Sequence, residues 1–211
     1  MRRPEFIARQ SRRPSGWLGE IVARVMARET VDANRAALDL LQLKAPDQVL
    51  EIGFGHGATL QAAAQIVTDG FLAGLDHSAV MHRIAGRRNA PFLRSGRMEL
   101  KLADSARIPY PNARFSKIYA VHTIYFWEKP ETHLGEIFRV MSPGGRLVLG
   151  YHPSEDARFA RAFPRSIYTV RAIKEIEAAT GVCGFQSVRT ETKAAAQGLM
   201  AWTIAQKPGR P

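Results

Sequence analysis

A glycine-rich segment limits what this chain can fold into more than any other feature. The residues VLEIGFGHGATL, Val49 to Leu60, open with an apolar run that contains Glu51, and Gly53, Gly55 and Gly57 follow at alternate positions. Glycine has no Cβ and adopts positive φ readily, so a turn of this kind brings bare backbone against a ligand. The segment therefore predicts a buried strand, a tight turn and a helix that begins at the turn.

Length and composition indicate one main domain without exported or membrane-spanning parts. At 211 residues with 45% hydrophobic content, the chain is long enough to bury a sizeable core. The single cysteine, Cys183, excludes an intrachain disulfide, which fits a reducing environment. No apolar run approaches the roughly 18 residues of a membrane span, and no apolar stretch of a secretory signal follows the opening MRRPEF. We therefore expect a cytoplasmic protein.

The chain is basic, with 30 Lys and Arg against 19 Asp and Glu and a formal net charge of +11. The positive residues gather in residues 1–28 and in a second cluster, made of Arg83, Arg87, Arg88, Arg94, Arg97 and Lys101. A solvated basic face is the simplest interpretation. Nucleic-acid binding is not favoured, because neither an aromatic stacking platform nor a helix-turn-helix pattern accompanies the charge. Contact with an anionic membrane surface or an acidic partner is the alternative.

The residues before the glycine segment divide into two regions. Residues 1–16 are rich in Arg, Pro and Ser and predict a flexible basic arm. Residues 17–45 predict two helices, and the first of them places Trp17 and Met26 on one apolar stripe. This first helix could form a lid over a ligand site, dock on the sheet, or lie on an anionic bilayer as a peripheral membrane contact.

Strand and helix patterns alternate through residues 46–207, which we expect to form the main domain. Apolar runs predict strands at residues 48–52, 71–76, 97–102, 117–121 and 146–151, and amphipathic stretches predict helices at residues 58–67, 78–88, 130–141 and 169–179. Two late strands, at residues 185–190 and 199–205, are joined by a polar loop and predict an antiparallel hairpin. The pattern predicts an α/β fold with a doubly wound, mostly parallel seven-stranded sheet that ends in this hairpin.

Ligands of such sheets bind at the carboxyl ends of the strands, and polar residues follow the predicted strands there. Asp76 could accept hydrogen bonds from a ribose hydroxyl pair, or it could cap the next helix. Asp104, with the backbone of Ser105, could recognise adenine or cap a loop. Glu51 lies at the tip of a buried strand, where an unpaired charge is costly, so it should meet a cation or N–H donors. His122 follows the fourth strand.

These segments together resemble the class I S-adenosylmethionine-dependent methyltransferases. The resemblance rests on VLEIGFGHG, on GLDHS around Asp76, on LADSARIPYPNARFSKIYAVHTIYFW and on RVMSPGGRLVLG, and it covers about residues 30–207. It implies a Rossmann-like methyltransferase fold and S-adenosyl-L-methionine as the cofactor. Within the superfamily, the chain looks most like the methyltransferases that act on small molecules, quinone rings or phospholipid amines. The resemblance therefore implies a small-molecule or lipid methyl acceptor.

The resemblance also implies roles for individual residues. The methionine part of the cofactor would lie against the first motif, its ribose beside the second, and its adenine beside the residues after the third strand. In chain order, the implied cofactor contacts are Glu51, Gly53, Phe54, Gly55, Gly57, Asp76, His77, Asp104, Ser105 and His122. His122 would lie at the floor of the pocket, where relatives usually have Asn or another small polar residue, so this position departs from the pattern.

A nicotinamide dinucleotide site, and with it an oxidoreductase, is the main alternative, because GFGHGA also satisfies G-x-G-x-x-A. Glu51 argues against it, since a carboxylate beside the turn would repel an anionic pyrophosphate but attract a sulfonium and an α-amino group. A hydride-transfer enzyme also does not need the pair of Asp104 and Ser105. A third interpretation keeps cofactor binding without catalysis, and the complete set of pocket acids argues against it.

Methyl transfer would proceed by in-line displacement at a methyl group that the cofactor has already activated. Proximity and alignment alone can contribute roughly 7–11 kcal/mol, so the reaction requires neither a dedicated catalytic residue nor a metal ion. His122 and Tyr125 are candidates for taking a proton from the acceptor. Candidate acceptor contacts are Trp17, Met26, Tyr125, Phe126, Trp127 and Tyr151. The aromatic rings among them could hold a cationic amine or a planar ring, or could simply pack under the following helix.

Overall fold

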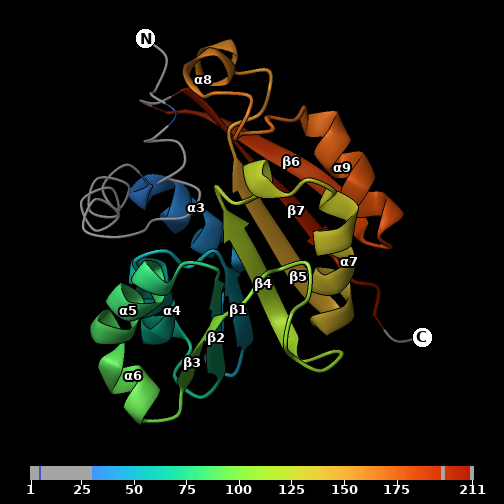
Figure 1. Ribbon diagram of the computed structural model, residues 1–211. Helices are drawn as coiled ribbons and strands as arrows, with labels where there is room; N and C mark the ends of the chain where they lie inside the picture. The colour runs from blue at the N-terminus through green and yellow to red at the C-terminus, as the bar shows by residue number, and fades with distance from the viewer. Residues whose placement is uncertain (1–4, 6–29, 196–197, 210–211) are drawn as a thin grey trace.

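The computed structural model describes Glu5 and residues 30–195 and 198–209 of the chain. Most of the predicted basic arm and the whole of the first predicted helix, including Trp17 and Met26, lie outside the described residues. Within the described residues, one sheet runs through the middle of the molecule and helices cover both of its faces (Figure 1). Its strands are β1 (Gln48–Ile52), β2 (Phe71–Asp76), β3 (Met98–Leu102), β4 (Phe115–Val121), β5 (Met141–Tyr151), β6 (Gln186–Ala195) and β7 (Gly198–Gln206).

The strands lie in the order β3-β2-β1-β4-β5-β7-β6. All neighbours are parallel except at β7, which runs antiparallel to both β5 and β6. The predicted seven-stranded, doubly wound sheet with its antiparallel hairpin is therefore confirmed. From β1 the chain builds outward through β2 and β3, and it then returns to place β4 on the other side of β1. Ligands bind at such a switch point, outside the carboxyl ends of the strands.

Two layers of helices bury the two faces of the sheet. Helices α3 (Val31–Leu41), α4 (Ala58–Ile66) and α5 (Ala79–Arg88) pack on one face, and α7 (Pro130–Val140) and α9 (Ile173–Val182) pack on the other. In β1, Val49 packs with the first layer and Leu50 with the second, and both are fully buried. A parallel strand that is buried on both faces has an almost continuous apolar sequence, and β1 was predicted from this pattern.

Three short helices were not predicted: α6 (Ala90–Arg94), the 3₁₀ helix η1 (Ile124–Phe126) and α8 (Ala157–Ala162). Each is too short to display an amphipathic repeat over several turns. Helix α8 begins because the Asp156 side chain accepts hydrogen bonds from the backbone N–H groups of Arg158 and Phe159, at 3.0 and 3.1 Å. This helix lies between β5 and α9, above the carboxyl end of the sheet (Figure 1).

Three predicted boundaries were wrong. Residues 142–145 do not end a helix in a loop, because β5 begins at Met141 directly after α7. The last helix begins at Ile173 instead of Thr169. At its start, the Glu175 carboxylate accepts the backbone N–H of Ala172 at 3.3 Å. The hairpin strands are longer than predicted, because cross-strand pairing continues to the last residue of β6 and the first of β7 in place of the polar loop.

The space around Gly74, on β2, shows how tightly the first layer of helices packs on the sheet. A Cβ there would lie 2.7 Å from Leu60 Cδ1 and Phe54 Cδ1 and 2.8 Å from Leu100 Cδ2. Gly74→Ala should therefore lower the free energy of unfolding in urea by about 1–3 kcal/mol, as overpacking usually does. Gly86→Ala, inside α5 with open space around the Cβ position, is the matched control and should stabilise by about 0.5–1 kcal/mol. Equal effects of the two substitutions would contradict this packing.

Candidate functional site

The glycine loop joins β1 to α4 as the sequence predicts. Gly53, Gly55 and Gly57 all have positive φ, at 75°, 51° and 74°. A Cβ at Gly53 would overlap the methyl group of Thr123, and one at Gly57 would lie 2.7 Å from Ala85 Cβ. A Cβ at Gly55 would meet no atom within 4 Å. The loop is therefore packed against the protein at its two outer glycines and open at the middle one, where backbone can approach a ligand.

Glu51 is a buried carboxylate with an unpaired oxygen. The residue is 4% exposed and lies on β1 beside its register partner Tyr119 on β4. Neither Glu51 Oε2 nor the Tyr119 hydroxyl has a hydrogen-bond partner among the described residues. Burial raises the pKa of Glu51 well above its ordinary value, the nearby Tyr119 hydroxyl opposes this rise, and the negative charge of Asp76 adds to it. A buried carboxylate with an unsatisfied oxygen is costly to ionise, so this position fits a ligand that brings a positively charged N–H donor.

Asp76 connects β2 to the glycine loop. Its Oδ2 accepts the backbone N–H of Gly55 at 2.9 Å, and its Oδ1 accepts the backbone N–H of Ser78 at 2.9 Å. Ser78 is the N-cap of α5, because its hydroxyl accepts the backbone N–H of Met81, so Asp76 does not serve as that cap. Burial raises the pKa of Asp76, while these hydrogen bonds lower it. Each oxygen keeps a lone pair for ribose hydroxyls. His77 follows in the same turn and is half-buried.

Asp104 and Ser105 lie in the loop after β3. Asp104 is exposed, and its Oδ1 accepts the backbone N–H of Ala106 at 2.8 Å, so the loop-capping interpretation holds in this structure. The Ser105 hydroxyl is 2.8 Å from Nδ1 of His133 on α7, a contact that sequence reasoning did not find. His133 stacks on Trp127 with ring centroids 4.9 Å apart and planes inclined by 7°. The loop is therefore tied to α7, with its carboxylate open to solvent.

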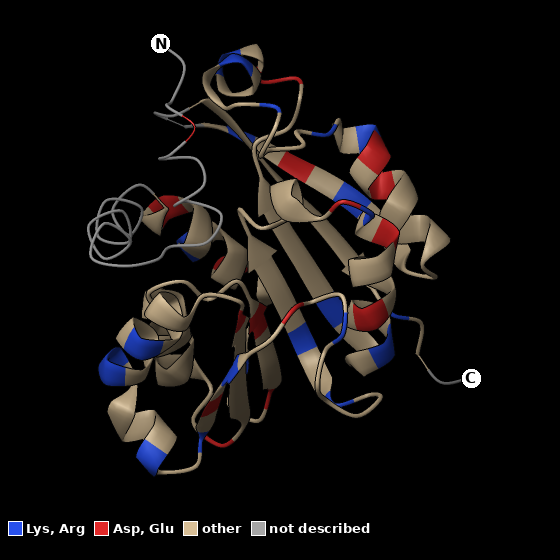
Figure 2. Cartoon of the chain, viewed as in Figure 1, with Lys and Arg blue, Asp and Glu red and all other residues tan. Residues whose placement is uncertain are grey.

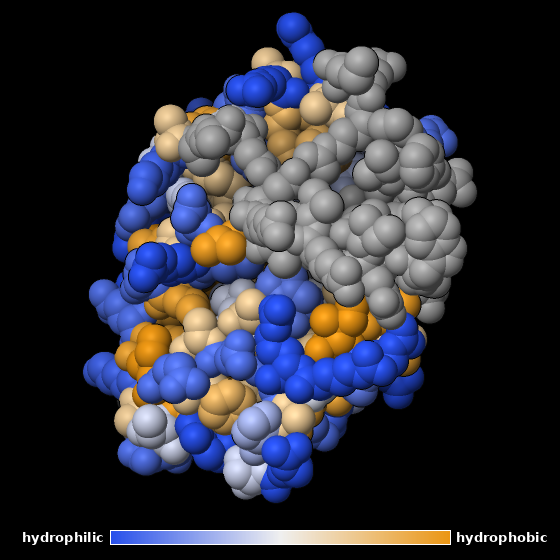
Figure 3. Space-filling model, turned by 90° about the vertical axis from the view of Figure 1, so that its left-hand side faces the viewer, coloured by the Kyte–Doolittle hydropathy of each residue, from blue (hydrophilic) through white to orange (hydrophobic). Residues whose placement is uncertain are grey.

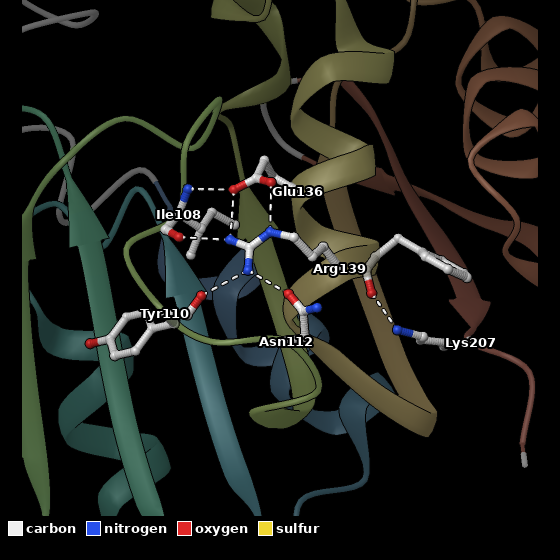
Figure 4. A network of polar contacts seen from close by, with 7 residues as sticks. Ile108, Tyr110, Asn112, Glu136, Arg139 and Lys207 are labelled. Carbon is white, nitrogen blue, oxygen red and sulfur yellow. Dashed lines mark hydrogen bonds and ion pairs between the residues drawn. The ribbon is translucent and has the colours of Figure 1, made fainter.

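Arg139 on α7 holds the rest of the loop after β3 (Figure 4). Its guanidinium donates to the carbonyls of Ile108 and Tyr110, both at 2.8 Å, and to the Asn112 side-chain oxygen at 2.9 Å. The Glu136 carboxylate binds the same guanidinium and accepts the Ile108 N–H at 2.8 Å. Hydrogen bonds to charged groups are stronger than neutral ones, so this network fixes the path of the loop that carries Asp104.

The predicted acceptor contacts are mostly buried. Tyr125 and Trp127 are each 3% exposed, and Phe126 is half-buried and packs on Tyr168. Tyr151 is 1% exposed, and its hydroxyl is 2.8 Å from Thr203 Oγ1 on β7. The structure thus gives the Tyr151 hydroxyl a partner within the sheet, and its contact with the acceptor stays a prediction.

His122 occupies an unusual turn at the carboxyl end of β4. It is half-buried with φ at 59°, in the left-handed region that non-glycine residues rarely adopt. Its backbone N–H donates to Gly150 O at 2.8 Å, and its Nδ1 is 3.2 Å from the Tyr125 hydroxyl. Burial lowers the pKa of His122 to about 3, so the ring is neutral at physiological pH. His122 thus lies next to Thr123, the residue that touches the glycine loop.

Among the described residues, no group of three or more His, Cys, Asp or Glu side chains is arranged to hold a metal ion. The same part of the chain contains no helix that is both long and apolar enough to cross a bilayer.

Comparison with known sequences agrees with this geometry. Residues 50–149 match the methyltransferase domain family. The uncharacterized methyltransferase YdaC of Bacillus subtilis is 27% identical over 190 residues, which cover 89% of this chain and 98% of YdaC. A demethylmenaquinone methyltransferase of Thermus thermophilus is 30% identical over 55% of this chain and 52% of the relative. The 27-O-demethylrifamycin SV methyltransferase of Amycolatopsis mediterranei is 27% identical over 72% of this chain and 58% of the relative. The chain therefore spans nearly all of YdaC but only about half of the other two.

Solved structures share the fold. An S-adenosylmethionine-dependent methyltransferase from Aquifex aeolicus superposes with a TM-score of 0.67 at 20% identity, over 82% of this chain and 88% of that one. The Haemonchus contortus phosphoethanolamine N-methyltransferase 2, in complex with S-adenosyl-L-methionine, superposes with a TM-score of 0.70 at 16% identity, over 84% and 53%. The [4+2]-cyclase SpnF does so with a TM-score of 0.70 at 17% identity, over 90% and 82%.

The strand order and the glycine loop at the switch point define a class I methyltransferase fold. The match to the methyltransferase domain family takes in the glycine loop and Asp76, and the chain shares its fold with solved methyltransferases.

Replacement of Glu51 should stabilise the free protein and weaken the cofactor complex. Because burial raises the folded-state pKa of Glu51, the stability contributed by its protonated form is complete below the unfolded pKa and is lost as the pH rises toward the folded pKa. Glu51→Gln cannot ionise, so its stability advantage over wild type should grow in urea titrations as the pH rises above about 4. Its affinity for S-adenosylhomocysteine should fall about 10- to 100-fold in calorimetry, because a charged hydrogen bond is lost.

Asp69→Asn is the control for this substitution, because Asp69 is exposed and precedes β2 at the opposite end of the sheet. It should leave the affinity for S-adenosylhomocysteine unchanged. A Glu51→Gln variant with a pH-independent stability difference and full affinity would contradict the role assigned to the buried carboxylate.

Proposed function

We propose that this chain transfers a methyl group from S-adenosylmethionine to a small-molecule acceptor by in-line displacement. The observation that carries the proposal is the unpaired, buried Glu51 carboxylate at the carboxyl end of the central strand, beside the glycine loop. An α-ammonium group is a cation that would meet this need. A dinucleotide pyrophosphate would instead add negative charge near Glu51 and Asp76, which disfavours the oxidoreductase alternative.

Each acid would hold a different part of the cofactor. Glu51 would accept from the α-ammonium group, Asp76 would accept from the ribose hydroxyls, and Asp104 with the backbone of Ser105 would hold adenine. The bound cofactor supplies a methyl group that a sulfonium has already activated. The chain's own contribution is to align the acceptor with that methyl group and to exclude water, and alignment alone can be worth roughly 7–11 kcal/mol.

The fold by itself does not specify methyl transfer, since a solved [4+2]-cyclase shares it. Two further observations support methyl transfer over a non-catalytic role. The match to the methyltransferase domain includes β1, the glycine loop and Asp76. Relatives that align over half or more of this chain are named for methyl transfer to a demethylmenaquinone and to a demethylrifamycin.

Transfer of a methyl group can be measured without knowing the natural acceptor. The full chain would be incubated with methyl-labelled S-adenosylmethionine and a panel of phenols, catechols, quinols and phosphoethanolamine. We expect labelled product from an acceptor on this panel, detected by mass spectrometry. Product should fall at least about 10-fold for Asp76→Ala at limiting cofactor, since the ribose contacts are lost. Tight cofactor binding without transfer to any acceptor would favour the non-catalytic interpretation.

The proposal includes a peripheral contact with an anionic membrane, which would suit a lipid or quinone acceptor. Arg83, Arg87, Arg88 and Arg94 are exposed on α5 and α6 and form a basic face at the β3 edge of the sheet (Figure 2). From the side of these helices, the surface is largely hydrophilic with separate hydrophobic spots (Figure 3). The arginines of residues 1–28 add to the net positive charge of the chain. Surface arginines near anionic lipid contribute about 1 kcal/mol each.

Co-sedimentation with liposomes tests the membrane contact. The full chain should bind vesicles that contain anionic phosphatidylserine at low salt and be released at high salt, because the attraction is screened. Substitution of Arg87 and Arg94 by Gln should weaken this binding several-fold. Phosphatidylcholine vesicles are the control and should bind little. Absence of salt-sensitive binding would remove the membrane contact and leave the methyl-transfer proposal intact.

A further inference from the structure

His122 and His152 form a stacked pair at the carboxyl ends of β4 and β5. Their ring centroids lie 5.5 Å apart, and their planes are inclined by 21°. The pair adjoins the cofactor loop, because Thr123 follows His122 and touches Gly53. His122 also has a strained backbone, and strain of this kind gathers at functional sites. Neither ring uses its Nε2 in a hydrogen bond with the described residues.

The neighbours of His152 determine which of its ring nitrogens carries the proton. Nδ1 lies 2.9 Å from Leu199 O and 3.5 Å from Asp156 Oδ2. Both oxygens accept hydrogen bonds, so Nδ1 carries the hydrogen and Nε2 is bare in the neutral ring. The Asp156 carboxylate is itself fixed, because it accepts the backbone N–H groups of Arg158, Phe159 and Leu199. This arrangement of carboxylate, imidazole and free Nε2 is that of an oriented base.

Tyr125 determines the opposite arrangement in His122. The Tyr125 hydroxyl oxygen accepts the backbone N–H of His152 at 2.5 Å and lies 3.2 Å from His122 Nδ1. The hydroxyl hydrogen has no other acceptor among the described residues, and a buried O–H without an acceptor is costly. The hydroxyl therefore donates to His122 Nδ1, and Nε2 of His122 carries the ring hydrogen. The pair thus offers one bare ring nitrogen and one N–H group.

We propose that this pair binds the methyl acceptor, with His152 Nε2 accepting the proton of the acceptor hydroxyl and His122 Nε2–H donating to a second oxygen beside it. The inference rests on the proposed methyl transfer. It narrows the acceptor to a neutral compound with a hydroxyl next to another oxygen, such as a catechol or an α-hydroxy carbonyl compound.

The atoms and charges of this step balance. The acceptor O–H bond breaks as its proton moves to His152 Nε2, and the oxygen forms a bond to the methyl carbon. The S–CH₃ bond of the sulfonium breaks, and its electron pair stays on sulfur. The products are a methyl ether, a neutral thioether and a protonated His152. Asp156 lies within reach to stabilise that imidazolium.

The surroundings of the pair keep both rings neutral and disfavour a cationic amine as the acceptor. Burial lowers the pKa of both imidazoles, most strongly in His122, where the charge of a protonated His152 would add to the effect. Asp156, at the start of α8, and Leu199 O on β7 raise the pKa of His152 in part. On its other face His152 stacks on Phe159, with centroids 4.2 Å apart. A neutral hydroxyl therefore fits better than an ammonium group.

The two tautomers can be observed without any acceptor. Full-length protein labelled with ¹⁵N-histidine would be examined by ¹H–¹⁵N correlation NMR at neutral pH with S-adenosylhomocysteine. We expect protonated Nδ1 in His152 and protonated Nε2 in His122, assigned with the His→Gln variants. His82 is an internal reference for protonated Nε2, because that atom lies 3.2 Å from Leu100 O. The same tautomer in His122 and His152, or an imidazolium in either, would overturn the proposal.

The acceptor class is tested with 4-nitrocatechol as the probe and S-adenosylmethionine as the methyl donor. His152→Gln should lower the rate of methyl ether formation at least about 100-fold, the usual effect of losing a general base. His122→Gln keeps an N–H donor and should lose less than about 10-fold. Wild-type rates should rise with pH until His152 is deprotonated, and His152→Gln should lose this dependence. No binding of 4-nitrocatechol, or equal losses in the two variants, would overturn the proposal.

Calorimetry with S-adenosylhomocysteine separates this inference from the proposed function. His152→Gln should bind it as tightly as wild type does and should unfold at a similar temperature. If wild type does not bind S-adenosylhomocysteine, the proposed function fails whatever the tautomers are. If it binds and the tautomers differ from those above, only the inference about the pair fails.

Discussion

The burial of the Glu51 carboxylate at the end of the central strand is the constraint on which the rest of the site depends. The strand that carries it lies between β2 and β4, so the side chain is surrounded by the core of the sheet. A carboxylate there weakens the fold, because it has an unpaired oxygen and a second acid, Asp76, on the neighbouring strand. A bound ammonium group would reverse both effects. In the proposed function, the free protein retains a destabilising group whose stabilising partner would arrive with the ligand.

Several loops follow the carboxyl ends of the strands next to Glu51, and each is held by a different interaction. Asp76 binds the Gly55 N–H and so ties β2 to the glycine loop. Thr123 touches Gly53 and brings the end of β4 against the same loop. Arg139 fixes the loop after β3 through backbone carbonyls. The glycine loop and the end of β4 are therefore joined through Thr123, so a change in one should be felt in the other.

Much of the fold could be predicted from the sequence, because its main signals are local. The apolar runs of β1, β2 and β4, the three positive-φ glycines and the Ser78 cap each follow from nearby residues. The cofactor half of the site could be predicted for the same reason, since Glu51 and Asp76 lie within the last two residues of their strands and Asp104 follows β3 by two residues. Whether these residues contact the cofactor in the assigned way stays a prediction.

The acceptor half depended on contacts between distant segments, which no local pattern reveals. Tyr151 ends an apolar strand and suggested an aromatic acceptor contact, but strand alternation directs its ring into the core toward Thr203. The sequence did not indicate a role for the next residue, His152, because that role depends on Asp156 and on Leu199, which is 47 residues away along the chain. The stacking of His133 on Trp127 likewise could not be predicted from the sequence around Trp127.

The central claim is that the buried Glu51 carboxylate pairs with the ammonium group of the cofactor. Titration with S-adenosylhomocysteine by calorimetry at about pH 6, in two buffers of different ionisation enthalpy, tests it most directly. Because burial raises the pKa of Glu51 and a bound ammonium group would lower it, we predict that binding releases protons from wild type and not from Glu51→Gln. Binding without proton release, or preferential binding of NADH in the same titration, would contradict the account.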